Sequence, residues 1–237
     1  MSQTRIGALG ACAFSSFVGF LTFAVAPHAL ADAGCVAGAN HLTSANTTTQ
    51  FFTAFGNALT PPEEGCALCG VLVTANASGM TQSQLNNLGA NFSAVDTDGV
   101  FGTMTLSGTT VTAANLGQLL SRTCVTATVS VNATGWDQAR INALAEHITK
   151  IDSITGLAAG RTLTVSADGV SGASISGAGS VILDSTAVSG TAVLTGISST
   201  LTFPASLSID AGGVLAAYPE QISGKTLVGG GTVSMVG

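Results

Sequence analysis

Few residues in this sequence have side chains suited to catalysis, and they lie far apart. Acid–base catalysis needs a histidine or carboxylates with shifted pKa values, and after the first 31 residues the only histidines are His41 and His147. His147 follows Glu146 on the flank of a predicted helix, opposite its apolar stripe, so we expect it to face solvent. A serine hydrolase would need the motif G-x-S-x-G at a strand-to-helix turn, which "GASISG" does not supply. We therefore predict no catalytic residue, no bound cofactor and no enzymatic activity.

One enzyme class stays open as an alternative, a polysaccharide lyase or hydrolase on a β-helix. Such a site would need clustered acids, a base and aromatic surfaces for the sugar rings. After residue 162 the aromatic residues are Phe203 and Tyr218, and Lys225 is the only base. Asp184 and Asp210 would be the acids to test.

A second alternative is a module that binds calcium or a small ligand. In "VDTDGVFG", Asp96 and Asp98 stand two residues apart before Gly99, which resembles the start of a calcium loop. A calcium loop also needs a distant acidic ligand at a fixed spacing, and none is present. The simpler interpretation is that these residues form the turn after a helix.

Four cysteines remain outside the first 31 residues: Cys35, Cys66, Cys69 and Cys124. In an exported chain, four cysteines indicate two disulfides, for which three pairings exist. We favour a local Cys66–Cys69 bridge with a Cys35–Cys124 bridge that closes the larger loop. A structural zinc site needs four ligands, and the sequence offers no second ligand pair for one.

The N-terminus has the pattern of an export signal over residues 1–31. Arg5 precedes the apolar run "ACAFSSFVGFLTFAVA", and "ALA" at 29–31 places small residues at a cleavage site. No later segment is apolar for long enough to span a membrane. We therefore predict a chain that is exported to the cell surface or the extracellular space, with the periplasm as an alternative, and without a membrane span after cleavage.

Composition restricts the partners. Only 8% of residues are charged, the net charge is −6, and Lys and Arg together number 6. Nucleic-acid binding needs clustered basic residues, so we exclude a nucleic-acid partner. The high apolar content argues against disorder.

The central region contains an internal repeat. "GMTQSQLNNLGANFSAVD" recurs 56 residues later as "GWDQARINALAEHITKID". The apolar positions of both stretches are spaced as on one face of a helix: Met80, Leu85, Leu88, Phe92 and Val95 match Trp136, Ile141, Leu144, Ile148 and Ile151.

Alternating strand-like runs flank both stretches, and a shorter predicted helix with Leu116, Leu119 and Leu120 lies between them. We predict a strand–helix repeat section over 71–161. One repeat cannot cover its own apolar stripe, so we expect the stripes of 80–95 and 136–151 to lie against each other as consecutive units of one stack.

The composition changes after residue 162. Short runs of β-branched residues alternate with Ser, Thr and Gly through 162–237, which predicts an all-β section. A parallel β-solenoid is the favoured architecture, and a β-sandwich is the alternative. The end of this section could present an open strand edge to another chain.

Residues 32–70 remain as a disulfide-tied cap for the first repeat. A predicted helix there has an apolar face formed by Phe51, Phe52, Phe55 and Leu59 and ends before Pro61. Four N-x-[ST] sequons occur, at Asn46, Asn76, Asn91 and Asn132. We interpret the repeated pair Asn76 and Asn132 as turn residues that lead into each helix.

The pattern x-Q-x-x-L-x-x-L…V-D…G-T-x-T-L-S over 71–166 resembles strand–helix repeats of large, low-charge bacterial surface proteins. In composition, 162–237 is similar to the β-helical part of adhesins and autotransporters. The resemblance implies an exported surface protein that acts by stacking, through self-association or a cell-surface partner, and implies no catalytic residue.

Overall fold

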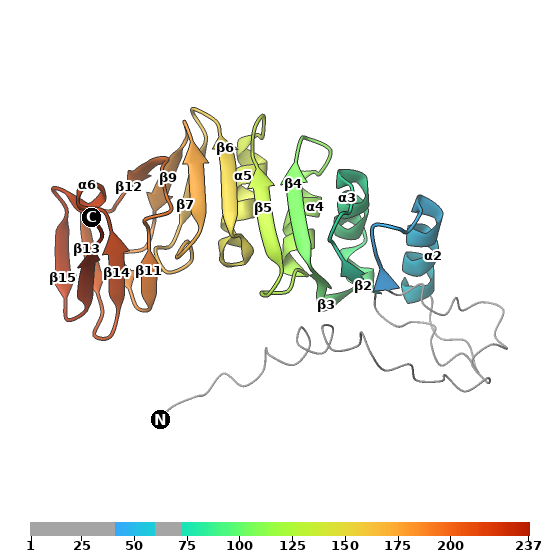
Figure 1. Ribbon diagram of the computed structural model, residues 1–237, viewed down its shortest axis with the longest axis horizontal. Coiled ribbons are helices and arrows are strands. Elements are labelled where there is room, and N and C mark those ends of the chain that lie inside the picture. The colour runs from blue at the N-terminus through green and yellow to red at the C-terminus, as the bar shows by residue number, and fades with distance from the viewer. Residues whose placement is uncertain (1–40, 60–72) are drawn as a thin grey trace, which may run out of the picture.

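The strands of this protein stand side by side in a row along the long axis of the molecule (Figure 1). The structure is a computed structural model that describes residues 41–59 and 73–237. It is a mixed α/β arrangement of parallel strands in several small sheets, with a few helices and no closed barrel. The predicted combination of α/β repeats and a β-rich C-terminal part is confirmed at this level.

Within the described residues, the strands form five sheets. The first sheet contains β1 (His41–Leu42), β2 (Val73–Asn76) and β3 (Val95–Phe101), and the second contains β4 (Thr103–Ser107), β5 (Thr128–Asn132), β6 (Ser153–Leu157) and β8 (Ser174–Gly177). The third contains β7 (Thr162–Val165), β9 (Ser180–Leu183) and β12 (Thr200–Thr202). The fourth contains β10 (Ala187–Val188), β13 (Ser206–Ile209) and β15 (Thr226–Gly229), and the fifth contains β11 (Thr191–Val193), β14 (Val214–Ala217) and β16 (Thr232–Met235).

The helices are concentrated in the first half of the chain. They are α2 (Thr48–Leu59), α3 (Gln82–Ala90), α4 (Ala113–Ser121), α5 (Gln138–Ala145) and the short α6 (Pro219–Ile222), and two 3₁₀ turns follow α3 and α5 at Phe92–Ala94 and Ile148–Lys150. Parallel neighbours need a crossover, and the helices supply it for the early strands. Among the later strands, loops and α6 do so.

Every ladder between the described strands is parallel, and each partner lies a similar distance along the chain. Thr103 pairs with Thr128, and Ser153 pairs with Ser174. The residues from 162 onward also form parallel ladders only, which the alternative of an antiparallel β-sandwich does not predict.

One hydrophobic cluster runs through all of these sheets, from Leu42 to Ile222. In β4, Met104 and Leu106 are buried while Thr103 and Thr105 are exposed, which is the period of a strand with one covered face. Nine of the ten paired apolar residues of the repeat are buried. The exception, Phe92, lies on the surface with the Arg122 guanidinium 5.8 Å from its ring centre.

The two copies of the repeat have the same local geometry. The Asn76 side chain accepts a hydrogen bond from the Ser78 N–H at 3.1 Å, and the Asn132 side chain does the same for Thr134 at 3.1 Å. The glycine that follows, Gly79 or Gly135, has a φ of 74° or 77°. This conformation favours glycine, so both copies enter their helix through the same turn.

The structure corrects the predicted order of the helices. α4 packs against both α3 and α5, so the stripes of 80–95 and 136–151 share one core without being consecutive. An offset of 56 residues corresponds to two strand-to-strand steps, and the shorter helix with Leu116, Leu119 and Leu120 occupies the step between. The helices are also shorter than the apolar stripe, because the chain turns back toward the next strand.

Glutamine side chains hold neighbouring strands at equivalent points of the two copies. Gln82 donates to the Thr105 carbonyl and accepts the Ser107 N–H at 3.0 Å. Gln138 donates to the carbonyl of Thr162 at 2.6 Å and accepts its N–H at 3.1 Å. Each glutamine thus replaces both hydrogen bonds that a neighbouring strand would make with that backbone.

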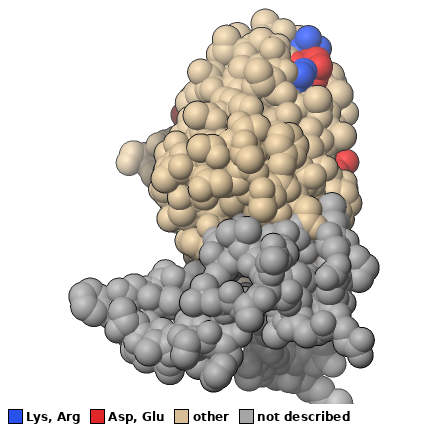
Figure 2. All heavy atoms as spheres, turned by 90° about the vertical axis from the view of Figure 1, so that its right-hand side faces the viewer, with Lys and Arg blue, Asp and Glu red and all other residues tan. Residues whose placement is uncertain are grey.

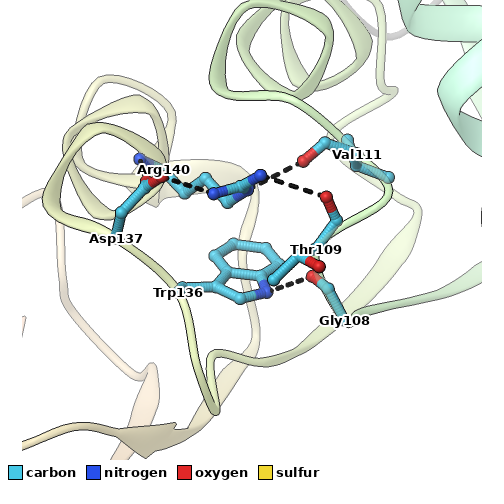
Figure 3. A network of polar contacts seen from close by, with 6 residues as sticks. All are labelled: Gly108, Thr109, Val111, Trp136, Asp137 and Arg140. Carbon is cyan, nitrogen blue, oxygen red and sulfur yellow. Dashed lines mark hydrogen bonds and ion pairs between the residues drawn. The ribbon is translucent and has the colours of Figure 1, made fainter.

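A second contact holds the start of α5 against the turn at 108–111 (Figure 3). The Trp136 Nε1 donates to the Gly108 carbonyl at 2.6 Å. The Arg140 guanidinium donates to the carbonyls of Val111 at 2.9 Å and Thr109 at 3.0 Å and pairs with the Asp137 carboxylate. The Arg140 N–H donates to that carboxylate, which lowers the pKa of Asp137.

The helix predicted near the N-terminus is present as α2, with one change in its apolar face. Phe51 and Phe55 are buried against the first sheet, whereas the Phe52 side chain is 60% exposed. The side chain of Leu59 lies outside the described part. Phe52 was wrongly assigned to the apolar face, because consecutive residues on a helix point about 100° apart.

Gly89 permits the close packing of α3 on α4. A Cβ atom at this position would lie 2.1 Å from the Asn115 carbonyl oxygen, whereas a Cβ atom at Gly117, inside α4, would meet nothing within 4 Å. The two glycines therefore form a matched pair for testing the helix contact.

We expect Gly89→Ala to lower the free energy of unfolding by about 1–3 kcal/mol, because it overpacks the helix contact. Gly117→Ala should raise it by about 0.5–1 kcal/mol, since alanine favours helix. Urea denaturation of both variants measures this. Equal stability of the two variants would contradict the packing of α3 on α4.

Candidate functional site

The acidic pair Asp96 and Asp98 lies inside β3 rather than in a turn after a helix. The pairing register shifts here, from Val73 opposite Val95 to Ala75 opposite Val100, so the strand bulges. Asp98 has a φ of 54°, and its carboxylate lies 3.6 Å from the Lys150 ammonium. Residues 41–59 and 73–237 contain no group of three or more His, Cys, Asp or Glu side chains that could hold a metal ion.

The residues considered for a sugar-cleaving site are not gathered at one place. Phe203 is only 4% exposed and belongs to the core, so its ring is not available to a ligand. Asp184 and Asp210 are exposed, and Asp210 accepts a hydrogen bond of 3.5 Å from the Ser208 hydroxyl. Tyr218 is half-buried and lines a separate hollow.

His41 has a structural environment at the first sheet. Its Nδ1 lies 2.9 Å from the Thr74 hydroxyl, and its ring stacks on Phe101 with a centroid separation of 5.6 Å. These contacts join β1 to its neighbours.

His147 is partly buried, which corrects the expectation that it faces solvent. It lies at the end of a groove of about 490 Å³ between α4 and α5, with Gln118, Asn142 and Glu146 among the lining residues. Burial lowers the pKa of the His147 imidazole, and the Lys150 ammonium lowers it further, while the Glu146 carboxylate acts in the opposite direction.

Cys124 is the one described cysteine. It is buried and has no free thiol. Cys35, Cys66 and Cys69 lie outside the described residues, so the predicted pairing stays a prediction.

The sequon asparagines all have backbone partners. Asn46 accepts the Thr43 N–H at 2.6 Å, and Asn91 donates to the Asn87 carbonyl at 2.8 Å. Together with the turns at Asn76 and Asn132, these contacts agree with asparagines that shape the backbone.

The C-terminal edge, defined as β15, β16 and Val236, is the most apolar exposed surface that the described residues form. β15 pairs only with β13, and β16 pairs only with β14, so each strand has one free edge. Val228, Val233, Met235 and Val236 are exposed there, and residues 226–237 contain no charged side chain. Native edge strands are usually protected by charge, proline or short length.

A second feature is the Tyr218 hollow, of about 520 Å³, where α6 meets the turn before β12. Its lining includes Thr195, Ser198, Leu201, Tyr218, Glu220 and Gln221. Of these residues only Tyr218 was considered from the sequence. Ser and Thr are too frequent in this chain for single positions to stand out, and the fold alone brings 195–201 beside α6.

Charged side chains are sparse elsewhere too. On the end that carries α2, Figure 2 shows them gathered in one small cluster near the top, while most of the visible described surface has none. None of the helices in the described ranges is both long and apolar enough to cross a membrane.

No family model matches this chain, and no curated protein or solved structure is significantly similar to it.

The lowered pKa of His147 makes the folded protein favour the neutral imidazole. As pH falls from about 6.5, the usual value, toward the folded pKa, the unfolded chain binds more protons, so the free energy of unfolding decreases. His147→Gln should lose this part of the decrease, and Gln118→Ala, in the same groove, should keep it. Urea denaturation at about pH 7.5 and about pH 5 compares the three proteins, and an unchanged decrease in His147→Gln would contradict the assignment.

Proposed function

We propose that this chain is an exported bacterial structural or adhesive protein of the cell surface or extracellular space. In this proposal it is a strand–helix solenoid that continues into a β-solenoid, and it acts by stacking against another copy or a surface partner. The observation that carries the proposal is the C-terminal edge, with free strand edges and exposed apolar side chains.

The solenoid architecture is supported by the ladders and by the core. Each strand pairs in parallel with a strand one unit later, as at Thr191 with Val214 and Val214 with Thr232. A single apolar cluster connects the units. In such a stack each unit covers its neighbour, so the end units determine what the molecule associates with.

The two ends differ in a way that favours association at the C-terminal edge. At the other end, β1 is only two residues long and α2 packs beside it. Short edge strands are poor templates for pairing with another chain. By contrast, β15 and β16 are each four residues long and lack charge.

We expect Val233→Lys to weaken self-association at least about tenfold, because a lysine on an edge strand opposes strand pairing. Val125→Lys is the control, since Val125 is 62% exposed, compared with 37% for Val233, and lies outside the C-terminal edge. Size-exclusion chromatography with light scattering over a range of concentrations measures the effect. A wild-type protein that is monomeric at every concentration and binds no cell surface would contradict the proposal.

Export has a separate test. The protein recovered from its natural host should have the mass of residues 32–237 with two disulfides, because cleavage follows the small residues at 29–31. Intact mass spectrometry with and without reduction measures this. A cytoplasmic protein that retains Arg5 would contradict export without affecting the result at Val233.

A further inference from the structure

The Tyr218 hollow combines an aromatic side chain, a carboxylate and hydroxyl groups on two adjacent units. α6 supplies Glu220, and the turn that follows β11 supplies Thr195 and Ser198. These elements lie near each other toward the C-terminal end of the row in Figure 1. The volume of about 520 Å³ is within the range of roughly 300–1,000 Å³ typical of small-ligand pockets.

The floor of the hollow is apolar and preformed. Ile197 is buried, and Leu201 and Tyr218 are half-buried, so a flat apolar surface is available to a ligand. Gln221 holds α6 against the opposite wall, because its amide donates to the carbonyls of Leu194 at 3.0 Å and Ile197 at 3.3 Å. A wall fixed in this way loses little freedom when a ligand binds.

The polar groups of the hollow mainly accept hydrogen bonds. The Glu220 carboxylate has no hydrogen-bond or ion-pair partner within the described residues and can only accept. The Ser198 hydroxyl already donates to the Ile175 carbonyl at 3.3 Å, so its oxygen is left as an acceptor. The matching ligand therefore presents several O–H donors beside an apolar face and has no negative charge.

We propose that the Tyr218 hollow binds a neutral pyranose unit of a glycan, with one sugar face on Tyr218 and Leu201 and its hydroxyls donating to Glu220 and Ser198. This binding site goes beyond the proposed function, since it does not require self-association. A uronic acid is excluded, because its carboxylate would meet the unpaired charge of Glu220.

The protein contains one tyrosine, so selective ring labelling gives a single NMR signal from the site. We expect this signal to shift saturably, with a Kd on the order of 1 mM, on titration with at least one of the methyl glycosides of glucose, galactose, mannose and N-acetylglucosamine. The methyl glycoside of glucuronic acid should cause no such shift. No shift with any of the four neutral glycosides, or equal binding of the glucuronide, would overturn the proposal.

Variants then assign the contacts, with ligand-observed NMR as the readout. Glu220→Gln should weaken binding about tenfold, because a hydrogen bond to a charged group is lost. Tyr218→Ala should abolish binding, while Tyr218→Phe keeps the ring and should retain it. Asp184→Asn removes an exposed carboxylate elsewhere and should bind like wild type. An unchanged affinity in Glu220→Gln would overturn the assignment, and repeating the titration in Val233→Lys separates it from self-association.

Discussion

The structure depends on parallel pairing between each strand and the strand one unit later in the chain. No unit has enough apolar surface to form a core alone, so Leu106, Val131 and Ile154 become buried only because neighbouring units cover them. The same dependence explains the low charge of the chain, since most positions face a neighbouring unit or a turn. It also means that an uncovered end unit exposes residues that would otherwise be core.

Polar side chains reinforce this pairing where the ladder leaves backbone groups without partners. Gln82 and Gln138 bind the backbone of the following strand from equivalent positions. Farther along, the Asp168 carboxylate accepts the Ser189 N–H at 2.9 Å and also binds Gly190. Buried or half-buried backbone groups need such partners. Several of the conspicuous polar residues in this sequence thus have structural roles.

The candidate site could be predicted from the sequence only in part. The open C-terminal edge was anticipated as an alternative, because "TLVGGGTVSMVG" has alternating apolar residues and no charge. The Tyr218 hollow was not anticipated as a site. Its aromatic residue is recognisable, but Thr195 and Ser198 are brought to Glu220 only by the stacking of two units. Phe203 was considered for the same purpose and is in the core, because its side chain points inward from the chain after β12.

By itself, the sequence determined the periodicities: the strand alternation, the repeated helix, the turn at Asn76 and Asn132, and the loss of long helices after α5. These are local, because they depend on residues within a few positions of one another. The tertiary structure alone decided that α4 separates the two copies, that Phe52 and Phe92 face outward, and that His147 is half-buried. Each of these outcomes depends on which distant segment covers a given side chain, and a local pattern does not contain that information.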